Sequence, residues 1–137
     1  MSARVLLIED NAANMDLARY LLQAYGFTCI EAADGEAGLR LAQAQRPDLV
    51  VCDLQLPGLD GFGVLRGLRA LPGFAGIPVI ALTAYAMVGD RDRVLAAGFD
   101  GYIAKPFDPQ RFVPQLAGFL GIEVPTPVRA RAADGGS

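Results

Sequence analysis

Short apolar runs alternate along the chain with longer stretches in which apolar residues recur every three or four positions. Continuous apolar runs are typical of strands buried on both faces, and the longer spacing is typical of the helices that cover them. The pattern predicts five strands, at Arg4–Ile8, Thr28–Ala32, Leu49–Cys52, Pro78–Leu82 and Gly101–Ile103. It predicts five helices, at 11–25, 34–44, 62–70, 87–97 and 108–120. Strands and helices that alternate in this way form a parallel sheet covered on both faces.

Capping residues mark the starts of several helices. Asn11, Asp34 and Asp108 can each accept a hydrogen bond from the first turn of the helix that follows. With these boundaries, we expect Leu17 of the first helix and Ala44 of the second to face the core.

The apolar periodicity ends at Gly121. We expect one domain over residues 1–121 and a flexible tail over 122–137, with a recognition peptide as the alternative for the tail. No apolar run approaches the roughly 20 residues of a membrane-spanning helix, and the N-terminus lacks the apolar stretch of a signal peptide. These observations predict a cytoplasmic protein that does not insert into membranes.

Composition narrows the classes of function. Hydrophobic residues make up 53% of the chain and charged residues 20%, which is typical of a folded domain. The chain has no histidine, which excludes a Ser-His-Asp triad, a Cys/His zinc finger and a histidine phosphocarrier. A net charge of -3 provides no broad basic face for nucleic acid. Cys29 and Cys52 lie in apolar runs, and we expect both in the core.

Polar side chains follow four of the predicted strands. Glu9 and Asp10 follow the first strand, Asp53 the third, Thr83 the fourth and Lys105 the fifth. Because the carboxyl ends of parallel strands meet at one edge of the sheet, we expect these side chains to lie together. Three neighbouring carboxylates repel one another unless a hard cation such as Mg²⁺ lies among them. Separate helix caps and loop charges are the alternative explanation.

Four segments resemble a known family. They are IEDN at Ile8–Asn11, VCDLQLPGLDG at Val51–Gly61, ALTAYA at Ala81–Ala86 and AKPF at Ala104–Phe107. In this order and spacing they resemble the receiver domains of bacterial two-component response regulators, over about residues 4–120. The resemblance implies an α/β fold of three layers, flavodoxin-like (CheY-like), with a five-stranded parallel sheet in the order 2-1-3-4-5 and five helices.

The resemblance also implies a chemistry for the acidic edge. Asp53 would accept a phosphoryl group from a histidine kinase or a histidine phosphotransferase. Glu9, Asp10 and Asp53 would hold Mg²⁺ together with the backbone carbonyl of Gln55. The residue types suit these roles, because a carboxylate can attack phosphorus to form an acyl phosphate. Lys105, the one lysine among 12 basic residues, would supply a mobile charge to the phosphoryl oxygens.

A switch is part of the same resemblance. Thr83 would bond to the new phosphoryl group, and Tyr102 would then rotate inward, although an ordinary half-buried aromatic is the alternative for Tyr102. The surface of the fourth helix, fifth strand and fifth helix, roughly Met87–Leu120, would change and bind a downstream partner protein. The Lys105–Pro106 bond is expected to be cis, as in the family.

No effector domain is expected after Leu120, so the chain resembles a stand-alone regulator, either a monomer or a phosphorylation-dependent dimer. The segments at 8–15 and 82–93 are most similar to alphaproteobacterial regulators of cell division and polarity. A phosphorelay shuttle and a chemotaxis-type motor regulator are the alternatives within the family. Such a protein is a phosphoacceptor with slow self-dephosphorylation rather than an enzyme, and Gln55 and Tyr85 would tune the lifetime of its phosphoryl group.

Two functions from other classes use related folds or sites. Aspartate-nucleophile phosphohydrolases carry a second acid two residues after the nucleophile, where this chain has Gln55, so a good general acid or base is absent. A flavodoxin-like electron carrier needs a phosphate-binding loop after the first strand. Here that loop reads EDNAAN and would repel phosphate.

Overall fold

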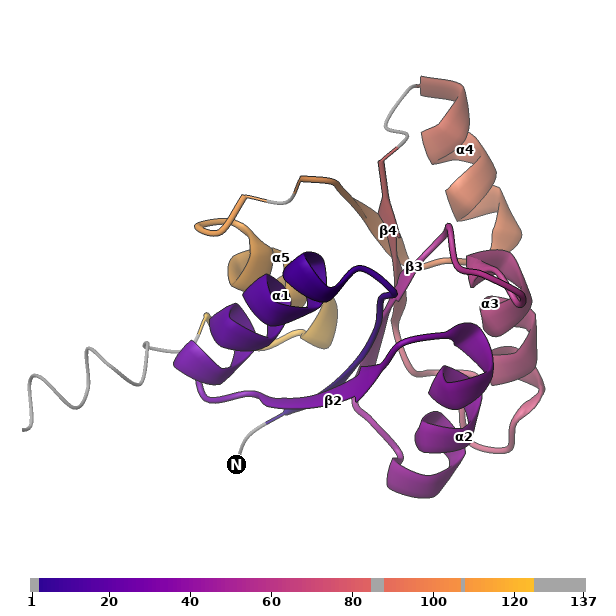
Figure 1. Cartoon of the computed structure of the whole chain (residues 1–137), viewed down its shortest axis with the longest axis horizontal. Coiled ribbons are helices and arrows are strands. Elements are labelled where there is room, and N and C mark those ends of the chain that lie inside the picture. Colours follow the sequence, from indigo (N-terminus) through magenta and orange to yellow (C-terminus); the bar gives the residue numbers. More distant parts are fainter. Residues whose placement is uncertain (1–2, 85–87, 107, 125–137) are drawn as a thin grey trace, which may run out of the picture.

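The computed structural model describes residues 3–84, 88–106 and 108–124, except for the side chain of Val88. In these ranges strands and helices alternate (Figure 1), as β1(Arg4–Ile8), α1(Ala12–Ala24), β2(Thr28–Ala32), α2(Gly35–Gln45), β3(Leu49–Asp53), α3(Gly61–Ala70), β4(Val79–Thr83), α4(Val88–Ala97), β5(Gly101–Ala104) and α5(Phe112–Leu120). The strands form a 5-stranded sheet in the order β2-β1-β3-β4-β5, and every neighbouring pair is parallel. Helices α1 and α5 cover one face, and α2, α3 and α4 cover the other (Figure 1). The predicted fold is confirmed.

The central strands are buried on both faces, which explains their continuous apolar sequences. Alternate residues of a strand point to opposite faces. In β1, Leu6 and Ile8 join the core beneath α2 and α3, whereas Val5 and Leu7 join the core beneath α1 and α5. All residues of β3 are buried as well. Two apolar layers therefore hold the sheet between its helices.

The strand register aligns the carboxyl ends of the strands. Ile8, the last residue of β1, pairs with Cys52, the residue before Asp53. Thr83, the last residue of β4, pairs with Ala104, the residue before Lys105. The residues that follow β1, β3, β4 and β5 therefore leave the sheet at one edge.

Side-chain caps begin three of the helices. Asn11 accepts a hydrogen bond from the Asn14 N–H at 3.0 Å, and Asp34 accepts one from the Ala37 N–H at 2.8 Å. Both caps were predicted. Asp60 plays the same role for α3, where it accepts from the Gly63 N–H at 2.9 Å.

The last helix begins later than predicted. Its first residue is Phe112, because residues 109–111 form a turn in which the Asp108 side chain accepts from the Gln110 N–H at 2.9 Å. The Asp108 carbonyl accepts from the N–H groups of Arg111 and Phe112. Asp108 therefore begins a turn that precedes the helix, instead of capping the helix itself. Pro114 then falls in the first turn, where its missing N–H does no harm.

Two predicted core positions are wrong. Leu17 is 38% exposed, since α1 turns Met15, Ala18, Leu21 and Leu22 toward the sheet instead. Ala44 is exposed, and Ala42 takes the buried position in α2. Of the two cysteines, Cys52 is buried as expected, whereas Cys29 is half-buried; neither forms a disulfide.

Tyr85, Met87, Phe107 and residues 125–137 of the predicted tail lie outside the described residues. None of the described helices combines the length and the apolar character that a membrane crossing requires.

Candidate functional site

The predicted site residues converge at the carboxyl edge of the sheet. Glu9, Asp10 and Asp53 each place one carboxylate oxygen within 4.8 Å of the others. Glu9 and Asp53 are 2% and 3% exposed, whereas Asp10 faces solvent. The acidic cluster is therefore half inside the protein and open on the side of Asp10.

Lys105 lies at the centre of the buried half. Its ammonium donates to Asp53 Oδ2 at 2.5 Å, to Glu9 Oε1 at 3.0 Å and to Glu9 Oε2 at 3.1 Å. The remaining Asp53 oxygen, Oδ1, accepts from the Gln55 N–H at 2.9 Å. Because buried charges are stable only when paired and hydrogen-bonded, these contacts keep both carboxylates in place.

Backbone contacts hold the loops that carry these side chains. The Lys105 N–H donates to the Thr83 carbonyl at 2.8 Å, which extends the pairing of β4 and β5. The Lys105–Pro106 peptide bond is cis, as predicted. On the other side, a Cβ atom at Gly61 would lie 2.7 Å from the backbone oxygen of Asp53. Only glycine therefore lets the start of α3 pack so closely on the loop after β3.

Burial and charge change the proton affinity of the site. Burial, and then the neighbouring Asp53, raise the pKa of the Glu9 carboxyl from 4.5 to about 7, against the opposing effect of bonds from Asn14 and Lys105. Burial lowers the pKa of the Lys105 ammonium, but its hydrogen bonds to Asp53 and Glu9 outweigh that effect and raise it. The lysine therefore stays charged, whereas the Glu9 carboxyl is partly protonated near neutral pH.

The donor set fits a hard divalent cation. Three carboxylates meet at one point with a single ammonium, which leaves an excess of negative charge that oxygen-seeking cations neutralise. Burial first, and then the neighbouring Asp53, raise the pKa of Glu9, and both effects disfavour a negative charge at this carboxylate that no cation balances. Gln55 lies in the same loop, two residues after Asp53, and its side chain is exposed.

Thr83 and Tyr102 lie beside this cluster on neighbouring strands. Thr83 is 2% exposed at the end of β4. Tyr102 is half-buried on β5, opposite Ala81, and packs against the core beneath α2 and α3. The structure thus places both predicted switch residues close to the acidic edge in the sheet.

One residue of the site escaped the sequence analysis. The Asn14 amide donates from Nδ2 to Glu9 Oε1 at 2.8 Å and helps to fix that carboxylate. A polar residue in the first turn of the helix that follows Glu9 was the available signal. It was ambiguous, because the same turn is also stabilised by the Asn11 cap.

Comparisons with known proteins identify this arrangement. Residues 5–117 match the profile of the response regulator receiver domain. The chain belongs to this family. Receiver domains bind Mg²⁺ at an acidic pocket and generally act in phosphorelay signalling rather than as enzymes.

Other response regulators are similar to this chain in sequence and in structure. The polar-differentiation response regulator DivK of Brucella anthropi is 40% identical over 121 residues, which cover 88% of this chain and 98% of the relative. A putative response regulator from Chloroflexus aurantiacus has a similar solved structure, with a TM-score of 0.83 and 29% identity over 88% of this chain and 99% of that chain. These relatives favour signalling over the phosphohydrolase and the electron carrier.

A third comparison bears on the acidic cluster. The receiver domain of a sensor histidine kinase from Pseudomonas aeruginosa has a TM-score of 0.81 and 37% identity, over 88% of this chain and 99% of that chain. Its structure was solved with a magnesium ion coordinated in the active-site cleft.

Proposed function

We propose that this receiver domain accepts a phosphoryl group on Asp53 from a phosphohistidine of a kinase or phosphotransferase. The observation that carries the proposal is the convergence of Asp53, Glu9 and the Lys105 ammonium at 2.5 to 3.1 Å. The similarity of this chain to DivK supports a role in cell polarity or division. The protein would carry out this role in the cytoplasm by binding partner proteins. Residues 1–121 form the signalling domain, and 122–137 a tail.

The transfer is a displacement at phosphorus. A carboxylate oxygen of Asp53 forms a bond to phosphorus as the phosphorus–nitrogen bond to the donor imidazole breaks, and the imidazole leaves with the electron pair. Lys105 already contacts Asp53 and donates to an oxygen of the negatively charged phosphoryl group as that group is transferred to Asp53. Mg²⁺, held by Glu9, Asp10, Asp53 and the Gln55 carbonyl, supplies positive charge to the phosphoryl oxygens when it is bound.

Loss of the phosphoryl group is slow. Hydrolysis needs a group that takes a proton from the attacking water, and a carboxylate two residues after the nucleophile would serve. This chain has Gln55 there, whose amide is not a base at neutral pH. The acyl phosphate therefore persists long enough to be read by a partner.

The phosphoryl group changes the output surface. It adds negative charge and acceptor oxygens beside Thr83, whose hydroxyl lies at the end of β4. Movement of Thr83 opens space for the ring of Tyr102 to turn inward. The surface of α4, β5 and α5 then binds a downstream protein, and a phosphorylation-dependent dimer is a second use of the same surface.

Intact mass spectrometry after incubation with acetyl phosphate and Mg²⁺ tests this function. We expect one phosphoryl adduct on the wild-type chain, since the Asp53 carboxylate displaces acetate from phosphorus. Asp53→Asn keeps the shape of the side chain and is expected to form none. An adduct that forms equally without Mg²⁺, or that remains in the Asp53→Asn variant, would contradict the proposed site.

A further inference from the structure

The described side chains of helix α4, those of residues 89–97, make little apolar contact with the domain. Among these described side chains, only Val94 is buried. Leu95, the other large apolar side chain in that range, is 42% exposed. A helix of this kind needs further contacts to hold its position, because most helical stability in proteins comes from the packing of an apolar face.

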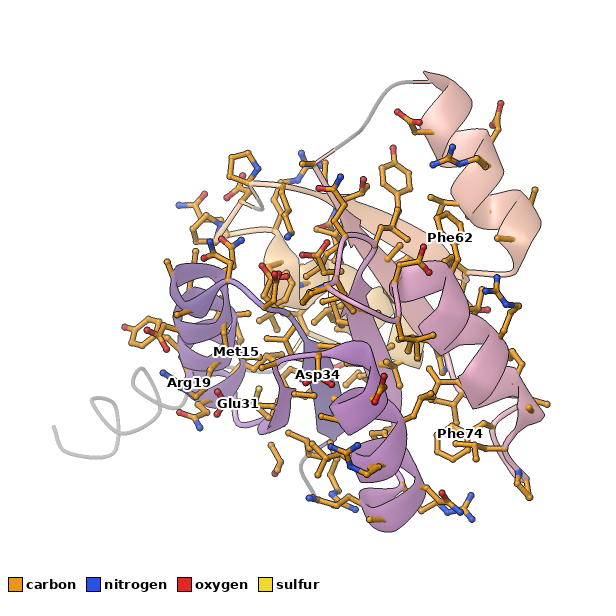
Figure 2. All side chains as sticks on the ribbon, turned by 45° about the vertical axis from the view of Figure 1, so that its right-hand side comes forward. Met15, Arg19, Glu31, Asp34, Phe62 and Phe74 are labelled. Carbon is orange, nitrogen blue, oxygen red and sulfur yellow. The ribbon has the colours of Figure 1, made fainter. Side chains whose placement is uncertain are left out.

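Two arginines provide those contacts. The guanidinium carbon of Arg91 lies 5.6 Å from the centre of the Tyr102 ring on β5. The guanidinium carbon of Arg93 lies 5.6 Å from the centre of the Phe62 ring on α3. Figure 2 shows Phe62 on the side of α3 that faces α4. Cations at this distance from an aromatic ring are attracted by the electrons of its face.

The two contacts lie on opposite flanks of Val94. Successive helical residues are separated by about 100° around the axis, so Val94 falls between the directions of Arg91 and Arg93. The buried Val94 side chain thus packs α4 onto the domain, and Arg91 and Arg93 add one contact on either side of it. The ring that Arg93 contacts is itself fixed in place, because Phe62 packs edge-to-face on the buried Phe99 with ring centres 5.7 Å apart.

A crevice separates α4 from the carboxyl edge of the sheet. It has a volume of about 200 Å³. Asp90, Arg93 and Val94 of α4 form one wall, and Gln55 and Thr83 belong to the opposite wall. The helix is therefore loosely packed on the side of the site, and the contact of Arg91 with Tyr102 ties it to β5.

We propose that Arg91 is a positioning residue that holds the ring of Tyr102 against α4 in the unphosphorylated protein. This inference rests on the proposed function, in which the ring turns inward after phosphorylation. An inward turn takes the ring away from the guanidinium, so the contact must be lost before the phosphorylated arrangement can form. Arg91 thereby favours the resting state and lowers the fraction of molecules that are ready to accept a phosphoryl group.

The proposal is tested by the rate of Asp53 phosphorylation in acetyl phosphate and saturating Mg²⁺, followed by intact mass. Arg91→Gln removes the cation, and we expect it to raise the rate about two- to five-fold, the range that an exposed cation–π contact provides. Arg91→Lys keeps a charge without the planar guanidinium, and its rate is expected to fall between the two. Arg66→Gln removes an exposed arginine of α3 and is expected to match the wild type.

Combination with Tyr102 variants makes the test specific to the ring. In a Tyr102→Phe background the ring remains, and Arg91→Gln is still expected to accelerate phosphorylation. In a Tyr102→Leu background the ring is gone, and Arg91→Gln is expected to have no further effect. Acceleration that persists in Tyr102→Leu, or an unchanged rate in Arg91→Gln alone, would overturn the positioning role.

Failure of the proposed function has a different signature. Wild-type protein that forms no adduct overturns the function and, with it, the effect of Arg91 on phosphorylation. Wild-type protein that forms the adduct at the same rate as Arg91→Gln overturns only the positioning role. Urea unfolding of all variants at the same pH shows that each is folded before its rate is compared.

Discussion

At the scale of single residues, the site depends on how one ammonium is shared between two buried carboxylates. Lys105 contacts both Glu9 and Asp53, and its side chain is 16% exposed, so the three charges interact with little screening by water. Removal of one partner from a buried ion pair usually costs about 3–5 kcal/mol, because the other charge is left unpaired. Two carboxylates and one ammonium leave one negative charge unbalanced, and a proton or a metal ion can neutralise it.

The proton affinity of Glu9 predicts the effect of pH on stability in a chelator. The pKa of this carboxyl is about 7 in the folded chain, and its ordinary value, which applies to the unfolded chain, is 4.5. The folded state therefore binds the proton more tightly. The resulting stability is fully present below pH 4.5 and is lost as the pH rises through about 7. We expect a loss of up to about 3 kcal/mol, measured by urea unfolding at a series of pH values.

Glu9→Gln is the matched variant for this measurement. Its amide does not titrate, so the loss of stability between pH 4.5 and 7 is expected to shrink markedly. Parallel profiles for Glu9→Gln and the wild type would show that Glu9 is not the group responsible.

At the scale of elements, the sheet and its helices differ in how firmly they are held. Both β1 and β3 are buried almost throughout, whereas α4 has one buried side chain among those described. Elements with few buried apolar contacts open at low free energy, and those with many open only when the whole domain unfolds. The site therefore lies on rigid strands, next to a helix that has few buried contacts and depends on the side-chain contacts of Arg91 and Arg93 for its position.

The start of α3 should tolerate no side chain at Gly61. A Cβ atom there would lie 2.7 Å from both the Asp53 oxygen and the Leu54 Cα, and neither backbone atom can rotate away. We expect Gly61→Ala to lower the free energy of unfolding by about 1–3 kcal/mol and to slow phosphorylation, because it displaces Asp53. Urea unfolding and the acetyl phosphate assay measure the two effects.

Gly118→Ala is the control for this substitution. Nothing lies within 4 Å of a Cβ atom at this position in α5. Alanine favours a helix over glycine, so we expect a gain of up to about 1 kcal/mol and an unchanged phosphorylation rate. Equal effects of the two substitutions would mean that the contact at Gly61 is not the cause.

At the scale of the whole molecule, one sheet edge combines the acceptor, its counter-ion and the switch residues, and the opposite end of the sheet carries none of them. Parallel strands in the order β2-β1-β3-β4-β5 bring β1 and β3 side by side, so their acidic ends become neighbours although they are separated by about a third of the chain. The topology itself builds the site. In the proposed division of the chain, residues 1–121 form the signalling domain and residues 122–137 a tail.

Deletion of residues 125–137, which make up most of the proposed tail at 122–137, tests that division. We expect the free energy of unfolding to change by less than about 0.5 kcal/mol, the range usual for changes away from packed residues. The rate of Asp53 phosphorylation is expected to stay the same. A larger loss of stability in urea, or a changed rate, would place part of the segment within the folded domain.

The sequence predicted the strands from local signals, and it predicted that Glu9, Asp10, Asp53 and Lys105 lie together from the rule that parallel strands end at one edge of a sheet. A continuous apolar run that ends in Asp53 or Thr83 identifies both the strand and its functional end. The start of α5 was missed, since Asp108 suits a turn as well as a helix cap. The exposure of Leu17 and the contact of Arg91 with Tyr102 depend on how separate elements meet, and the pattern along one helix does not contain that information.

The position of Lys105 also has a consequence for chemical labelling. It is the one lysine among the 12 basic residues of the chain, so it is the one side chain of this sequence that reagents for primary amines can modify. Ion pairs with Glu9 and Asp53, together with burial, protect Lys105 from such reagents. The extent to which an amine-reactive ester modifies Lys105 thus reports directly on the state of the acidic edge.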